Sequence, residues 1–87
     1  MKDKPFKVLV VDDNVLYAQA IGKRLKDSKL DIDLAYTATE ALDLCQVGRY
    51  QCILLDHKLP DDDGIRIIPI LMSRQQRCSL IMMTAYG

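Results

Sequence analysis

Short apolar runs alternate along the chain with longer amphipathic segments. Residues 7–11 (KVLVV), 51–55 (QCILL) and 80–84 (LIMMT) are nearly continuous aliphatic runs, as is typical of strands that are buried on both faces of a parallel sheet. Residues 31–36 (DIDLAY) instead alternate polar and apolar side chains, which predicts a strand with one more solvated face. We therefore expect strands in all of these segments.

The segments between the apolar runs have the pattern of amphipathic helices. The first covers about residues 14–26, where apolar side chains recur with helical spacing. The second covers residues 37–48; it opens with the Thr-x-x-Glu spacing of a capping box and ends at a glycine. The third covers about residues 65–74 and follows a turn that is rich in Pro, Asp and Gly.

The resulting element order is β-α-β-α-β-α-β. Strands that alternate with helices pair in parallel through right-handed crossovers, so the pattern predicts an α/β fold with a doubly wound parallel sheet. The chain has 87 residues, which favours a single small domain over residues 1–87. In such sheets ligands bind beyond the carboxyl ends of the strands, and the candidate chemistry is expected there.

Carboxylates follow two of the predicted strands. Asp12 and Asp13 come directly after the first strand, and Asp56 follows the run at residues 51–55. If these strands are neighbours, the carboxylates converge, and their repulsion raises at least one pKa unless a cation lies among them. An all-oxygen site of this kind suits Mg²⁺ or Mn²⁺. Thr84 ends the last strand at the same edge, where its hydroxyl can donate to a bound oxyanion.

Each of these side chains also has a purely structural interpretation. Asp12 and Asp13 can cap the following helix, and Asp56 can close a turn at the end of a strand. Because carboxylates follow two separate strands, we favour a shared functional site over these structural interpretations. The acidic run at residues 61–63 is interpreted as a solvated turn that leads into the third helix, and not as a second metal site.

Composition narrows the class of protein. The chain is 49% hydrophobic, which is too apolar for a disordered chain, and its 12 basic and 12 acidic residues include no basic cluster that would favour direct nucleic-acid binding. We expect no membrane span and no signal peptide. Three widely spaced cysteines and a single histidine do not form a zinc motif, and reduced thiols in a cytoplasmic protein are the expected state.

Three sequence segments together resemble the receiver domain of two-component response regulators. They are residues 8–14 (VLVVDDN), residues 53–56 (ILLD) with Pro60 and Asp63-Gly64 after them, and residues 81–85 (IMMTA). The resemblance covers essentially the whole chain and implies the flavodoxin-like receiver fold. It also implies a signalling module that is controlled by phosphorylation, and not an enzyme that turns over a separate substrate.

The resemblance assigns a role to each candidate site residue. Asp56 corresponds to the aspartate that accepts a phosphoryl group from a histidine kinase or a phosphotransfer protein. Asp12 and Asp13 correspond to the acidic pair that holds Mg²⁺, and Lys58 to the position whose backbone carbonyl also meets the metal. Thr84 corresponds to the residue whose hydroxyl binds a phosphoryl oxygen.

The receiver fold of the family continues with a further helix, a fifth strand and a last helix, and the chain ends before them. The resemblance therefore implies a receiver that lacks the fifth-strand lysine which pairs with the phosphoryl group. An uncovered fourth strand favours pairing with another chain, so we expect self-association. The output domain lies outside this chain, and transcription control is one candidate for it.

Two other functions remain open at this point. A pseudo-receiver would bind a protein partner without phosphoryl chemistry. A Mg²⁺-dependent phosphatase would also use a strand-end aspartate as its nucleophile. Such phosphatases usually need a second aspartate two residues after the nucleophile, and Lys58 occupies that position.

Overall fold

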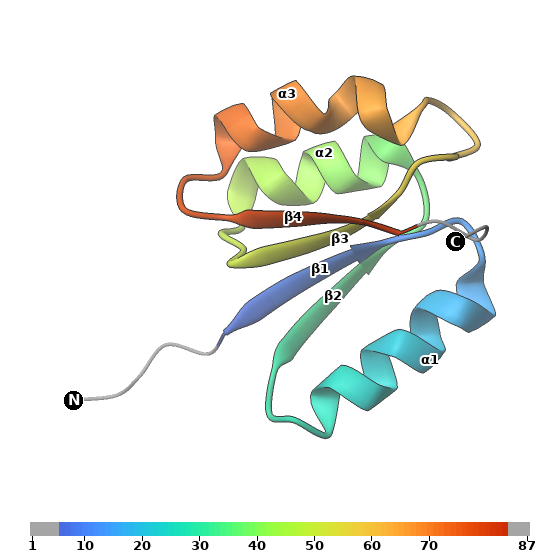
Figure 1. The fold of residues 1–87 in the computed structure, drawn as a ribbon, viewed down its shortest axis with the longest axis vertical. Helices are drawn as coiled ribbons and strands as arrows, with labels where there is room; N and C mark the ends of the chain where they lie inside the picture. Colours follow the sequence, from blue (N-terminus) through green and yellow to red (C-terminus); the bar gives the residue numbers. More distant parts are fainter. Residues whose placement is uncertain (1–5, 84–87) are drawn as a thin grey trace.

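The computed structural model describes residues 6–83, which form a sheet with helices on both faces (Figure 1). The elements are β1 (Lys7–Val11), α1 (Val15–Lys26), β2 (Asp31–Ala35), α2 (Ala38–Val47), β3 (Cys52–Asp56), α3 (Gly64–Arg74) and β4 (Ser79–Met83). The predicted element order is confirmed. Every bound that falls on a described residue lies within one residue of its prediction.

The sheet has the strand order β2-β1-β3-β4, and all of its pairs are parallel. Val11, the last residue of β1, lies opposite Ala35 of β2 and Leu55 of β3. Helix α1 covers one face of the sheet, and α2 and α3 cover the other (Figure 1). This arrangement is the predicted doubly wound α/β fold, with β1 and β3 as neighbours.

The core is divided by the sheet into two apolar layers. Strand β1 contributes to both layers, because Leu9 and Val11 face α2 and α3 while Val8 and Val10 face α1. Alternate side chains of a strand point to opposite faces, so a strand covered on both faces is apolar throughout. This is the physical reason for the continuous aliphatic run from which β1 was predicted.

Strand β4 is less buried than its sequence predicts. Ile81 and Met82 are exposed to 52% and 37%, whereas the equivalent run in β1 is almost fully buried. Within the described residues, β4 lies at one edge of the sheet, opposite β2, and is hydrogen-bonded to β3 alone. The prediction of a strand buried on both faces, made from the aliphatic run alone, is therefore wrong for β4, because aliphatic content does not reveal which strand lies at the edge. The exposure agrees instead with the uncovered fourth strand that the family resemblance implies.

Local capping explains where the helices begin. The Asn14 side chain accepts a hydrogen bond from the Tyr17 amide at the start of α1. The predicted capping box of α2 forms, since Thr37 Oγ1 accepts from the Glu40 amide at 3.0 Å and the Glu40 carboxylate accepts from the Tyr36 amide at 2.8 Å. None of the helices within residues 6–83 combines the length and apolarity that crossing a membrane requires.

Candidate functional site

The three candidate carboxylates meet at one edge of the sheet. Asp12 directly follows β1, Asp13 is the next residue, and Asp56 is the last residue of β3. One oxygen atom from each carboxylate lies within 4.8 Å of those of the other two. The predicted convergence is confirmed, and it follows from the parallel pairing of β1 with β3, which brings the carboxyl ends of both strands to the same edge.

Backbone hydrogen bonds hold the carboxylate of Asp12 in place. The Asp12 amide donates to Ala35 O at 3.0 Å and so extends the pairing of β1 with β2. Its carboxylate accepts from the Asn14 amide at 2.9 Å. Asp12 is 6% exposed, whereas Asp13 is exposed and Asp56 is half-buried. The cluster therefore presents one fixed, buried carboxylate and two that solvent can reach.

The carboxylates of the cluster repel one another. Burial raises the pKa of Asp12 above its usual value of 3.8, and the nearby charges of Asp56 and Asp13 raise it further, against the lowering effect of the Asn14 amide. The predicted direction is confirmed, although burial outweighs the repulsion between charges. Among the described residues, the nearest potential cation is His57, whose Nδ1 lies 3.9 Å from Asp56 Oδ1 and is charged only when protonated.

The cluster has the donor chemistry of a divalent-cation site. All of its donor atoms are carboxylate oxygens, which hard cations such as Mg²⁺ prefer. A divalent ion would also relieve the charge effects that raise the pKa of Asp12. The residues present therefore fit the metal that the sequence predicts.

Glycine at position 64 allows α3 to begin against the backbone of Asp56. A Cβ atom at Gly64 would overlap the carbonyl oxygen of Asp56 and would lie 2.9 Å from His57 Cα. The Gly64 amide donates to His57 O at 2.7 Å, and Asp63 caps the helix by accepting from the Ile65 amide. The predicted turn chemistry is confirmed, and the close approach fixes the strand end that carries Asp56.

The acidic run at residues 61–63 is not a simple solvated turn. The Asp61 carboxylate accepts from the Ala38 amide at 2.7 Å and from the Thr39 amide at 3.0 Å, and from Thr39 Oγ1 at 2.7 Å. Asp61 is exposed, as the prediction of a solvated turn requires, but the prediction did not include its contact with the start of α2, where free amides need acceptors. No local sequence signal predicts this contact, since the partners lie 22 and 23 residues apart.

The remaining predicted site residues differ in what the structure describes. Lys58 is exposed and lies in the loop between β3 and α3, two residues after Asp56; its amide makes a long contact of 3.4 Å with Asp56 Oδ1. An isolated antiparallel bridge joins Lys58 to Asp63 across the loop. Thr84 lies outside the described residues, and its role stays a prediction.

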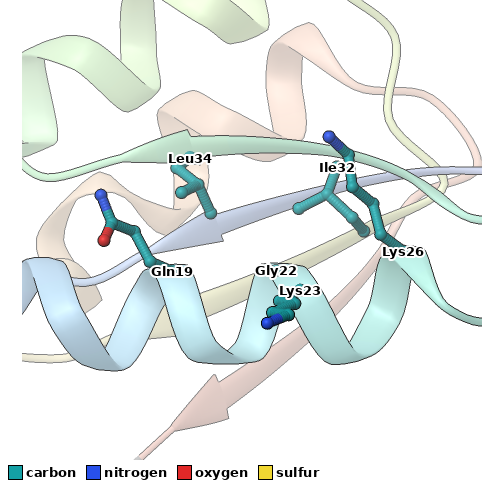
Figure 2. Close-up of a pocket in the computed structure, with 6 residues that line it drawn as sticks. All are labelled: Gln19, Gly22, Lys23, Lys26, Ile32 and Leu34. Atoms are coloured by element: carbon teal, nitrogen blue, oxygen red, sulfur yellow. The ribbon is translucent and has the colours of Figure 1, made fainter.

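A separate cavity of about 290 Å³ lies between α1 and β2 (Figure 2). Its lining residues are Gln19, Gly22, Lys23, Lys26, Ile32 and Leu34. Gly22 permits the close helix–strand approach there, because a Cβ atom would lie 3.3 Å from a methyl group of Leu34. None of the lining residues belongs to the carboxylate cluster, so this cavity is not part of the candidate site.

Comparison with known proteins agrees with the fold. A family model described as "Response regulator receiver domain" matches residues 8–87, and the chain belongs to this family. The transcriptional regulatory protein SrrA of Staphylococcus aureus (strain NCTC 8325 / PS 47) is 35% identical over 81 residues, which is 93% of this chain and 33% of SrrA. The chain therefore spans about a third of the length of this relative.

Solved structures of response regulators have the same fold. A Burkholderia pseudomallei response regulator, with a phosphorylated aspartic acid, calcium ion and citrate, matches with a TM-score of 0.90 and 28% identity over 98% of this chain and 49% of that chain. TrrA of Thermotoga maritima, in complex with Mg²⁺ and BeF, matches with a TM-score of 0.84 and 27% identity over 93% of this chain and 70% of that chain. The predicted receiver fold is confirmed.

Proposed function

We propose that this receiver domain, over residues 1–87, is switched by phosphorylation of Asp56 in the presence of Mg²⁺. The observation that carries the proposal is the convergence of Asp12, Asp13 and Asp56 within 4.8 Å at one sheet edge. A local structural role in a cap or a turn could explain an aspartate at one strand end, but it does not require carboxylates from two strand ends to face one another. Their mutual charge disfavours the folded state unless a cation binds.

Four groups would hold the metal ion in this proposal. They are the carboxylates of Asp12, Asp13 and Asp56 and the backbone carbonyl of Lys58. Mg²⁺ is the expected ion and Mn²⁺ an alternative, because both prefer oxygen donors. The bound ion would reduce the repulsion between an attacking carboxylate and the phosphoryl oxygens.

The chain's own residues define the proposed transfer. An ionised carboxylate oxygen of Asp56 attacks the phosphorus of a phosphohistidine, so that an O–P bond forms. The N–P bond of the donor breaks, and its electron pair stays with the imidazole. The Thr84 hydroxyl is proposed to donate a hydrogen bond to a phosphoryl oxygen. This chemistry modifies the chain itself, and no separate substrate is turned over.

The proposed partners follow from this chemistry. A histidine kinase or a phosphotransfer protein would supply the phosphoryl group. The output would lie in another domain, with transcription control as the first candidate, because SrrA is a transcriptional regulatory protein of which this chain spans a third. A cytoplasmic location is consistent with three free cysteines among the described residues.

We also propose that the chain self-associates through β4. In the part of the chain that the structure describes, β4 pairs with β3 alone, and its Ile81 and Met82 side chains are exposed to 52% and 37%. An open, apolar strand edge favours pairing with a second chain. Light scattering at micromolar concentration should give a mass above that of the monomer, and a clean monomer would contradict this proposal.

The central test is incubation with acetyl phosphate and Mg²⁺, followed by intact-mass measurement. We expect a phosphoryl adduct in the wild-type chain and in Asp62→Asn, and none in Asp56→Asn. Binding of beryllofluoride with Mg²⁺, followed by amide NMR, detects the same site where the adduct is short-lived. Absence of both signals in the wild type would favour the pseudo-receiver, and turnover of an aryl phosphate would favour the phosphatase.

A further inference from the structure

The Asp61 carboxylate joins the loop after β3 to the start of α2. Both of its oxygens are used: Oδ1 accepts from the Ala38 amide at 2.7 Å, and Oδ2 accepts from the Thr39 amide at 3.0 Å and from Thr39 Oγ1 at 2.7 Å. Figure 1 shows the loop and the start of α2 side by side at the same edge of the sheet. By accepting these three hydrogen bonds, the exposed Asp61 carboxylate tethers the loop to the start of α2.

The tether completes the capping of α2. Thr37, the N-cap residue, accepts from the Glu40 amide through its side chain and from the Ala41 amide through its carbonyl. The amides of Ala38 and Thr39, which come first in the helix, are satisfied by Asp61. The Thr39 hydroxyl and these amides lower the pKa of Asp61 below its usual value of 3.8, so the carboxylate stays ionised near neutral pH.

The other polar contacts of the loop at residues 57–63 lie within the loop, involve the preceding Asp56 or reach α3, where Asp62 lies 3.8 Å from Arg66 and Asp63 accepts from the Ile65 amide. Backbone bonds from the Leu59 amide to Asp62 O at 3.2 Å and from the Gly64 amide to His57 O at 2.7 Å close the loop upon itself. The Leu59 side chain packs against the core between the sheet and α2 with α3. The Asp61 bonds are thus the polar connection that the structure provides between this loop tip and α2.

We propose that Asp61 is a positioning residue for the divalent-cation site. By binding the start of α2 it holds the loop that begins after Asp56, and with it the backbone carbonyl of Lys58, in the orientation that an ion requires. The inference rests on the proposed function, because it assumes that the carboxylate cluster binds Mg²⁺. Residues that orient metal ligands from outside the ligand set commonly change metal affinity by about tenfold or more.

The test is the Mg²⁺ dissociation constant of the 87-residue chain, measured by calorimetry. We expect Asp61→Ala to weaken Mg²⁺ binding by about tenfold, Asp61→Asn by less because one oxygen acceptor remains, and Thr39→Val by about threefold because only the hydroxyl contact is lost. Amide exchange in metal-free protein gives a second readout: exchange at Lys58 and Leu59 should become faster in Asp61→Ala.

Two matched variants separate positioning from other effects. Thr37→Ala removes a cap from the same end of α2 without touching the loop, so it should lower the melting temperature and leave the Mg²⁺ dissociation constant within about twofold. Asp62→Ala removes the same charge from the same loop without contacting α2, and should also stay within about twofold.

The outcomes distinguish this inference from the proposed function. Equal Mg²⁺ affinity in Asp61→Ala and the wild type, or equal weakening in Asp61→Ala and Thr37→Ala, would overturn the positioning role. A wild-type chain that binds no Mg²⁺ would overturn the proposed function itself. Weaker binding in the Asp61 and Thr39 variants alone would establish the tether as part of the site.

Discussion

Asp33 lies in β2 and Asp12 directly follows the neighbouring strand β1, but the two carboxylates have opposite surroundings. The Asp33 carboxylate accepts a hydrogen bond from the Tyr50 hydroxyl at 2.6 Å and lies 3.6 Å from Lys7 Nζ. The Asp12 carboxylate faces two further carboxylates, Asp13 and Asp56, within 4.8 Å. The same type of side chain is balanced by partners in one region and faces like charges in the other.

The polar groups around Asp33 have hydrogen-bond or charged partners. Lys7 Nζ lies 5.4 Å from the centre of the Tyr50 ring, and the Tyr50 amide donates to Gln75 Oε1 at 2.8 Å. The amide nitrogen of the Gln75 side chain donates to Cys45 O and to Gly48 O, both at 2.8 Å. Complete pairing stabilises a fold, whereas facing carboxylates create a requirement for a cation. The difference separates a structural region from a functional one.

The largest expected effect tests the region around Asp33. Gln75→Met keeps the size of a buried side chain but leaves the Tyr50 amide and the carbonyls of Cys45 and Gly48 without their partner. We expect the free energy of unfolding to fall by about 3 kcal/mol. Urea denaturation measures it, with the exposed neighbour variant Gln76→Met as the control. Equal stability of the two variants would show that the Gln75 bonds are not structural.

We expect a smaller loss of stability when the Tyr50 hydroxyl, the hydrogen-bond partner of Asp33, is removed. Tyr50→Phe deletes the hydroxyl that donates to Asp33, which should lower the free energy of unfolding by about 1.5 kcal/mol. Burial, and then Asp33, raise the pKa of Tyr50 above 10.0, so its contribution is present below pH 10.0 and is lost as the pH rises through the raised pKa.

The Tyr50 prediction is checked by denaturation at neutral and alkaline pH. Above pH 10.0 the wild type should lose stability more steeply than Tyr50→Phe. Tyr17→Phe, at an exposed position of α1, is the matched control and should behave as the wild type. A loss in Tyr17→Phe as large as that in Tyr50→Phe would contradict the structural role of the buried hydroxyl.

The smallest expected effect has the opposite sign and tests the carboxylate cluster. Asp12→Asn removes a buried like charge and should raise the stability of the metal-free protein, on the order of 1 kcal/mol or less. Because folding raises the pKa of Asp12 above 3.8, the stability of the wild type should fall as the pH rises from 3.8 through the raised pKa. This pH dependence should be weaker in Asp12→Asn.

Thermal unfolding with and without Mg²⁺ tests whether Asp12→Asn stabilises the metal-free protein. Excess Mg²⁺ should stabilise the wild type and have little effect on Asp12→Asn, because binding to the folded state alone raises stability. Asp43→Asn, which removes an exposed carboxylate from α2, is the control. It should change neither the stability of the metal-free protein nor the stabilisation by Mg²⁺. Destabilisation by Asp12→Asn equal to that of Tyr50→Phe would remove the distinction between the two regions.

The carboxylate cluster could be predicted from the sequence because it depends on regular structure. Aliphatic runs locate β1 and β3, and parallel pairing places the residues that follow them at one edge. These two features are sufficient to predict that the carboxylates of Asp12, Asp13 and Asp56 lie close together. The aliphatic run of β4 did not predict its exposure, since such a run shows that a strand forms but does not show whether it lies inside the sheet. Only the family resemblance implied an uncovered fourth strand.

Local patterns in the sequence thus determined the order of helices and strands, the helix caps and the edge at which the carboxylates gather. Only the tertiary structure decided the partners of Asp61 and Gln75, which lie 22 to 30 residues away along the chain. These bonds depend on how far two elements are separated and on how their side chains are directed after packing. Periodicity and capping signals act over a few residues and carry no information about either quantity.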